Sequence, residues 1–585
     1  MRSTTRSTRT NKVSTTLMRM TAPLALAASA GLAHAELPAA LDRVPDSALV
    51  TASIGNLEAF IGDARQLQGG LDMLGGGAEA IGAAGQLLET DGIDRDGSVA
   101  LAMMPNADGG EPNLLLIAPV DDFDAFVGSF DGETVGNISS FEFQGQRMHA
   151  KSIGGGYAAL SPDDETITTF TGEGGKLGIH ESLAGPTGAR VAADSDTIVI
   201  ANIQLLKPQL EEGYEGLKGQ MKMMAMMAGP QAGDMEAQME ALDVIAASFL
   251  RDAKVGIVGL DVSADGLAID LASQFAEGSE IAGFFKSAGD SPKLLTKVPD
   301  MEFLIAGAGD FSAPGIQQLL KNSNELNAQM NTGAMAMDMG KFWTASEGMA
   351  GVLGASPALF AGGLFSNSVL FVSGEPESTR GTMRDLYAKM NDQTIEGMTY
   401  TTSYDTGSVE IEGQQVDTWK MGMKVDPAHP QAMMMQQSMM MMLGPQMGFS
   451  GYATTVDDGY VTTYSQNTAL MKKALGAAGG DGGLGSSDAI EKIASELPED
   501  RFAEAYLGTK TLMGYARMAM SMMGGGAQFD VPDELDPIGV GISGNEGGFR
   551  ARTYITKDVL NTIGQFQNQG GGGGGGNQGG GGPRF

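Results

Sequence analysis

The sequence predicts an α+β protein of two tandem, topologically similar lobes, each a mostly antiparallel sheet covered by helices. Three observations support this fold class. The chain repeats one pattern of landmarks, apolar alternation on both sides of a tight turn is typical of an antiparallel hairpin, and 585 residues exceed one ordinary hydrophobic core. Because 42% of the residues are hydrophobic, we expect folded lobes rather than a disordered chain.

The first 35 residues have the three parts of a secretory signal. A basic start without acids is followed by a short apolar run over 21–32, and Ala33-His34-Ala35 supplies a small-x-small cleavage pattern. The alternative is a disordered basic N-terminus. We therefore expect a signal peptide over 1–35 and an exported protein, periplasmic or secreted, without lipid attachment because no Cys follows the cleavage point.

The opening of the mature chain recurs near its middle. Residues 41–57 match residues 295–311 at an offset of 254, and each segment reads as a Pro-Asp turn, a strand and a helix entered near Asn56 or Asp310. The identical pairs are Leu41 and Leu295, Val44 and Val298, Pro45 and Pro299, Asp46 and Asp300, and Ala52 and Ala306. This match indicates a duplicated unit.

Further landmarks follow in the same order in both copies. They are residues 114–117 and 369–372, 145–146 and 413–414, 156–157 and 459–460, 194–206 and 500–512, and 265–266 and 547–548. In the first copy, the turn over 263–266 between two alternating apolar runs predicts an antiparallel hairpin. We therefore predict a first repeat over 36–289, a second over 290–566 and a flexible Gly-rich tail over 567–585.

Charge and cysteine content exclude several classes of function. A net charge of −34 repels nucleic acid and anionic lipid headgroups, so we expect no nucleic-acid partner. The absence of Cys excludes disulfides, thiolate catalysis, iron–sulfur clusters and Cys-based zinc sites. No stretch after the signal approaches 18 uninterrupted apolar residues, so we expect no transmembrane segment in the mature chain.

The sequence contains no catalytic motif. After cleavage only His149, His180 and His429 remain, far apart along the chain, and neither a nucleophile elbow nor a Walker loop is present. We therefore expect a non-enzymatic protein with no catalytic residues, cofactor or metal. A hydrolase built on two carboxylates that meet only in the fold stays open as an alternative.

Methionine is the most unusual feature of the composition, with 39 residues concentrated in clusters. Three interpretations stay open: loosely packed connecting helices, a soft apolar surface that accepts a protein, peptide or lipid, and copper(I) held by thioethers. The favoured function is an exported interaction or structural protein, and the alternative is a carrier of a hydrophobic ligand or a copper(I)-binding protein. The expected apolar contact residues are Met223, Met226, Met434, Met440, Met518 and Met522.

Short motifs add a resemblance to a known family. The Val44-Pro45-Asp46 opening, the LLLIAPVDDFDAF segment over 114–126 and the GGGYAALSPDDETI segment over 154–167 carry it. In these motifs the chain resembles an exported bacterial family known only as a domain of unknown function. The resemblance implies a large exported α+β protein, often duplicated, with no catalytic residues to carry over.

Overall fold

The computed structural model describes most of the chain outside its two ends. The described residues are 37–67, 85–106, 110–143, 145–172, 178–228, 243, 246–330, 346–356, 363–395, 397–429, 432–522 and 531–570. The expected signal peptide over 1–35 lies outside them, as does the expected tail from residue 571 onward. Residues 567–570, which the sequence assigns to that tail, instead continue the last helix, α20 (Lys557–Gly570).

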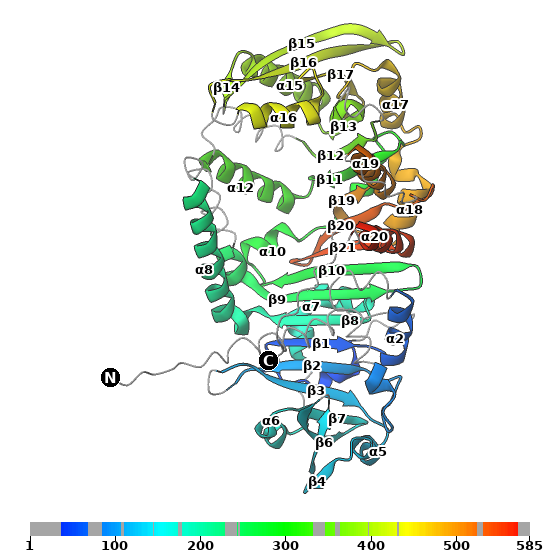
Figure 1. Cartoon of the computed structure of the whole chain (residues 1–585). Coiled ribbons are helices and arrows are strands. Elements are labelled where there is room, and N and C mark those ends of the chain that lie inside the picture. The colour runs from blue at the N-terminus through cyan, green and yellow to red at the C-terminus, as the bar shows by residue number, and fades with distance from the viewer. Residues whose placement is uncertain are drawn as a thin grey trace, which may run out of the picture.

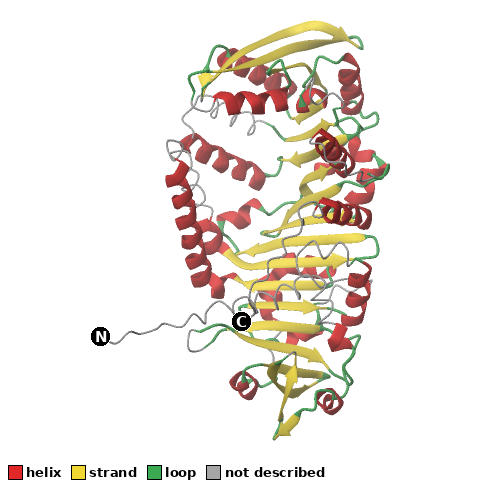
Figure 2. Cartoon of the chain, viewed as in Figure 1, coloured by secondary structure: helices red, strands yellow, loops and turns green. Residues whose placement is uncertain are grey.

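The strands all belong to one open sheet of mixed α+β architecture (Figures 1 and 2). The strands before residue 290 are β1 (Val50–Ile54), β2 (Val99–Met104), β3 (Asn113–Pro119), β4 (Glu133–Val135), β5 (Ile138–Phe143), β6 (Gln146–Gly154), β7 (Tyr157–Ser161), β8 (Thr197–Asn202), β9 (Ala253–Val262) and β10 (Gly266–Phe275). The later strands are β11 (Phe303–Asp310), β12 (Gly348–Gly354), β13 (Ser368–Ser373), β14 (Thr394–Ile395), β15 (Met398–Ile411), β16 (Gln414–Val425), β17 (Gly448–Val456), β18 (Gly459–Thr463), β19 (Arg501–Leu507), β20 (Ile538–Asn545) and β21 (Gly548–Thr556).

Neighbouring strands pair antiparallel throughout the sheet. From one edge to the other the order is β4, β5, β6, β7, β3, β2, β1, β8, β9, β10, β21, β20, β19, β11, β12, β13, β18, β17, β16, β15 and β14. The expected hairpin is confirmed, since β9 and β10 pair on either side of Ser263–Gly266. The two edge strands β4 and β14 are short, which limits edge-to-edge pairing with other chains.

The expectation of two lobes with a sheet each is not confirmed. β10 pairs with β21 from Gly266 opposite Thr556 to Gln274 opposite Gly548, and this long ladder joins all strands into one sheet. An unpaired β10 would leave a row of backbone N–H and C=O groups exposed, and β21 provides their partners.

Helices lie on both faces of the sheet. The α-helices besides α20 are α2 (Leu57–Gln66), α5 (Phe123–Gly128), α6 (Asp164–Thr169), α7 (Gly178–Ala193), α8 (Ile203–Ala228), α10 (Glu280–Phe284), α11 (Ser291–Leu295), α12 (Pro314–Met330), α15 (Pro376–Met390), α16 (Ala432–Leu443), α17 (Thr468–Ala478), α18 (Asp488–Ala494) and α19 (Thr509–Met522). Val191 of α7 shares a core cluster with Ala272, whereas α2 and α20 share one with Leu267. Because residues 267 and 272 of one strand point to opposite faces, these helices cover opposite faces of β10.

Local sequence explains where several helices begin. The Asn56 side chain accepts a hydrogen bond from the Ala59 amide, as expected for the N-cap of α2. The corresponding expectation at Asp310 is wrong, because this residue ends β11 and α12 begins later, at Pro314. In the described part of the chain, none of the helices combines the length and apolar character that a membrane crossing requires.

Candidate functional site

One face of the central sheet is apolar and partly exposed. We call it the apolar face and define it by Ile269 and Leu271 of β10, Ile305 of β11 and the apolar residues Ala505, Val540, Ile542, Ala551 and Ile555 on the same side of the intervening strands, where Thr553 also lies. Leu271 is 54% exposed and Ile305 is 49% exposed. Four strand spacings, about 19 Å, separate these two strands, so the exposed apolar side chains extend across the middle of the molecule.

Helices border this face at both ends of β10. At one end Leu267 is buried in a cluster with α2 and with Leu560 of α20. At the other end Phe275 is buried with Ile203, which begins α8, and with Ala282 of α10. Leu271 lies between these two clusters and stays exposed. In Figure 1, α8 and α10 lie to the left of the central strands and α2 and α20 to the right.

The opposite face of the same strands carries buried charges, and we call it the charged face. Asp270 of β10 is fully buried and accepts hydrogen bonds from Arg550 Nε at 2.6 Å and Arg552 Nη1 at 2.6 Å, both on β21. Arg550 also pairs with Asp194 at 2.6 Å, and Arg552 pairs with Asp261 at 2.8 Å. These ion pairs join the two strands that unite the sheet.

A second buried group of charges extends the charged face into β19. The Glu504 carboxylate accepts hydrogen bonds from Arg501 Nε at 2.6 Å and from the Tyr506 hydroxyl at 2.8 Å.

In the group around Arg550 and Arg552, burial raises the pKa of Asp261, although Arg552 beside it acts to lower that pKa. Asp194, Asp261 and Asp270 are joined through Arg550 and Arg552, so their charges are neutralised, whereas a two-acid hydrolase requires two carboxyls that face one substrate.

The methionines selected from the sequence lie on three separate helices. Met223 of α8 is 64% exposed, and Met434 and Met440 of α16 are 60% and 50% exposed. Met518 lies half-buried on α19. Met226 and Met522 fall within α8 and α19, but their side chains lie outside the described residues. The predicted contact residues Met223 of α8 and Met434 and Met440 of α16 are therefore accessible to solvent.

The structure does not place these helices around one common groove. α8 packs against β8 and β9, α16 packs against β16 and the 3₁₀ turn η4 (Leu364–Asn367), and α19 packs against β11. In Figure 1, α8 and α16 lie on the left and α19 on the right of the sheet. Met433 and Met442 add to the exposed surface of α16, at 85% and 47%.

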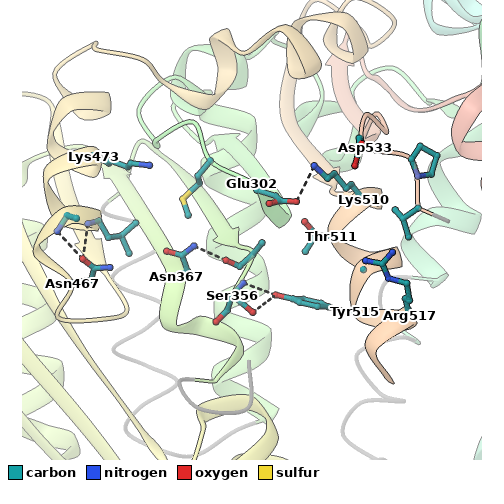
Figure 3. Close-up of a pocket in the computed structure, with 17 residues that line it drawn as sticks. Glu302, Ser356, Asn367, Asn467, Lys473, Lys510, Thr511, Tyr515, Arg517 and Asp533 are labelled. Carbon is teal, nitrogen blue, oxygen red and sulfur yellow. Dashed lines mark hydrogen bonds and ion pairs between the residues drawn. The ribbon is translucent and has the colours of Figure 1, made fainter. Parts of the chain in front are cut away.

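A pocket of about 720 Å³ lies between α17 and α19 (Figure 3). Lys473 of α17 lines one side, and Lys510 and Arg517 of α19 line the other. Lys510 lies 3.8 Å from the Glu302 carboxylate. Lys473 and Arg517 form no ion pair with any residue that the structure describes.

Amide and hydroxyl groups, apolar side chains and the carboxylate of Asp533 complete the pocket lining. The Ser356 amide donates to the Tyr515 hydroxyl at 2.8 Å, and Asn367 Nδ2 donates to the Ala355 carbonyl at 2.9 Å. Thr511 is 6% exposed, and its Oγ1 has no hydrogen-bond partner among the described residues. Sequence reasoning missed this pocket because its residues come from segments up to about 230 positions apart.

One histidine lies near a serine and an aspartate. Ser140 Oγ lies 3.0 Å from His149 Nδ1, and Asp164 Oδ1 lies 3.7 Å from the same nitrogen. A catalytic triad needs the serine and the carboxylate on different ring nitrogens, so this group lacks triad geometry. His429 lies in the loop after β16, and the His180 side chain lies outside the described residues.

Within the described residues no group of His, Asp and Glu side chains has the arrangement of a metal site. No family model, no curated protein and no solved structure matches the chain, so the family resemblance of its motifs stays a prediction.

Proposed function

We propose that this chain is an exported, non-enzymatic protein that binds an elongated hydrophobic ligand on the apolar face. One observation carries the proposal: the central strands bury their charged side chains and leave leucine and isoleucine exposed. Antiparallel sheets with one solvated face ordinarily have the reverse pattern, with apolar residues inside and polar residues outside. An exposed apolar patch on a soluble protein commonly marks a binding surface.

The pairing of the strands favours a lipid acyl chain over an extended peptide. Each strand that forms the apolar face pairs with a neighbour on both edges, so its backbone offers no free row of hydrogen-bonding groups. An extended peptide laid across this face would leave its own N–H and C=O groups without partners, which costs free energy. An acyl chain has no such groups.

Exposed side chains on the bordering helices suit the same ligand. Leu205 of α8 is 42% exposed, and Met223 extends the apolar surface of the same helix. Methionine side chains adapt to the shape of what they contact, which favours a ligand class over one molecule. The net charge of −34 favours a neutral lipid over an anionic one.

Replacing Leu271 and Ile305 together by serine is expected to weaken binding of a neutral apolar probe, N-phenyl-1-naphthylamine, by at least about tenfold, because two buried apolar contacts are lost. Fluorescence titration measures the affinity, and displacement by monoolein shows that probe and lipid compete. The matched control is Val135→Ser, which removes an 81% exposed apolar side chain on the edge strand β4. Equal affinity for the wild type and the Leu271→Ser, Ile305→Ser variant would reject the proposal.

The second candidate function is protein interaction through α16. Four exposed methionines lie on this helix, which carries no charged residue, and the lack of Lys and Arg argues against a membrane as the partner. If α16 is the binding surface, replacing Met433, Met434, Met440 and Met442 by serine is expected to abolish binding of the apolar probe. The control variant Gln436→Ser, Gln437→Ser is expected to retain it. Bound copper in native mass spectrometry would instead indicate a thioether metal site.

We also propose that the sheet arose by duplication. Outward from the β10–β21 pair the strands follow the orders β10, β9, β8, β1, β2, β3 and β21, β20, β19, β11, β12, β13. These two series match element by element, which supports repeats over 36–289 and 290–566. The sequence match pairs Ala306 with Ala52, but Ala306 lies on the face that Thr51 occupies in the first half. A bulge between Phe303 and Ile305, which shifts the register of β11 by one residue, accounts for this difference.

A further inference from the structure

We propose that the pocket between α17 and α19 binds a small organic anion that carries carboxylate or phosphate groups together with hydroxyl groups. The pocket is separate from the apolar face, and the inference stands whether or not a lipid binds there. Its volume of about 720 Å³ is within the range of ordinary small-molecule sites.

The charges of the pocket favour an anion. The chain has 37 Lys and Arg against 71 Asp and Glu, yet the three cations Lys473, Lys510 and Arg517 outnumber the two acids, Glu302 and Asp533, in the lining of this one pocket. In an acidic protein most cations have an acidic neighbour, but Lys473 and Arg517 have no ion partner among the described residues. Figure 3 shows these cations on two sides of the pocket, which suits a ligand with two acidic groups.

Thr511 supplies an independent observation. It lies in the first turn of α19 and lines the pocket, and it is 6% exposed while its hydroxyl has no hydrogen-bond partner in the described structure. A buried hydroxyl without a partner is unfavourable, and such groups in native proteins call for an explanation. The Thr511 Oγ1 atom exposes less than 1 Å², so rotation of the side chain about χ1 would be needed to bring it to a ligand oxygen in the pocket, which would then provide the missing partner.

The polar lining narrows the class of ligand further. Asn467 Oδ1 caps α17 and Asn367 Nδ2 donates to the Ala355 carbonyl, which leaves Asn467 Nδ2 as a donor and Asn367 Oδ1 as an acceptor for a ligand. Such groups recognise hydroxyls by hydrogen bonds, whereas the cations recognise acidic groups. Sugar phosphates and hydroxylated dicarboxylates both fit this combination.

The corresponding part of the first half is closed by its own hydrogen bonds. Asn113, at the start of β3, donates to Asp163 Oδ2 at 3.3 Å and to Thr166 Oγ1 at 3.1 Å. The helix there, α6, is also shorter than α17, and with the two helix starts aligned it carries the uncharged Thr169 at the position of Lys473. We therefore expect one anion site for each chain, despite the similar strand order of the two halves.

Isothermal titration calorimetry of the mature protein with glucose 6-phosphate, tartrate and glucose tests the proposal. We expect glucose 6-phosphate, tartrate or both to bind at one site, and neutral glucose not to bind. Comparing glucose 6-phosphate with tartrate distinguishes recognition of phosphate from recognition of carboxylate. Lys473→Gln with Arg517→Gln is expected to weaken anion binding by at least about tenfold. The matched control, Lys472→Gln with Lys389→Gln, removes two charges elsewhere and should bind as the wild type does.

Thr511→Val distinguishes ligand recognition from a structural role. Valine matches threonine in shape and removes the unpaired hydroxyl, so we expect anion affinity to fall about threefold to tenfold while the thermal midpoint of the ligand-free protein does not fall. Equal anion affinity in the wild type and the Lys473→Gln, Arg517→Gln variant would overturn the proposal. Absence of binding to the wild type at millimolar anion would also overturn it.

Discussion

Asp270→Asn is expected to lower the free energy of unfolding by about 3–5 kcal/mol, because it removes the fully buried negative charge that pairs with both Arg550 and Arg552. Arg550 and Arg552 are 4% and 5% exposed, so water cannot replace the lost carboxylate. Asp270 also accepts a hydrogen bond from Ser195 at 3.3 Å. Since these residues join β10 to β21, the substitution weakens the ladder that unites the sheet.

Denaturant unfolding of the mature protein measures this effect, and Asp194→Asn is the matched control. Asp194 pairs with the same Arg550, but its side chain is 51% exposed, so we expect a change of no more than about 1 kcal/mol. A loss of similar size in the two variants would contradict the view that the buried pair carries the stability of the junction.

Asp417→Asn is expected to cost about 2–3 kcal/mol at neutral pH and to reduce the acid sensitivity of the protein. The fully buried Asp417 carboxylate accepts hydrogen bonds from Arg380 Nε and Nη2 at 2.7 and 2.6 Å, from the Tyr404 hydroxyl at 2.7 Å and from the Gly407 amide at 2.6 Å. Burial acts to raise the pKa of Asp417, but these hydrogen bonds outweigh it and hold the pKa below its usual value.

The sign of the pH dependence follows from the lowered pKa. The stabilisation is complete above the pKa of the unfolded chain, about 3.9, and is lost as the pH falls through the lower pKa of the folded state. Unfolding curves between about pH 5 and pH 3 should therefore show a smaller loss of stability in Asp417→Asn than in the wild type. Asp405→Asn, on the exposed part of β15, should behave as the wild type does, and equal acid sensitivity of all three proteins would refute this assignment.

Local features of the fold were predictable from the sequence, and long-range pairing was not. The hairpin at 263–266 and the N-cap at Asn56 depend on neighbouring residues and are confirmed. The pairing of β10 with β21 joins residues about 282 positions apart, and the sequence of neither strand indicates which strand it pairs with. The prediction of separate sheets was wrong for that reason.

The orientation of β10 shows why the candidate site was only partly predictable. Its alternation of Leu267, Ile269 and Leu271 with Ala268, Asp270 and Ala272 indicates a two-faced strand, and ordinary reasoning would bury the leucines and expose the aspartate. In the structure Leu271 is exposed and Asp270 is buried. The carboxylate can be buried because Arg550 and Arg552, on a strand distant in sequence, neutralise its charge. The methionine clusters, by contrast, were visible in the sequence, and their exposure on α8 and α16 needed the fold.

Photo-crosslinking with a neutral diazirine-bearing monoacylglycerol, mapped by peptide mass spectrometry on the mature protein, tests the hydrophobic-ligand proposal most directly. We expect labelled peptides to contain Leu271 or Ile305, or Leu205 of the bordering helix α8. Labelling confined to 432–443, or spread evenly over outer positions such as Val135, would contradict binding on the apolar face.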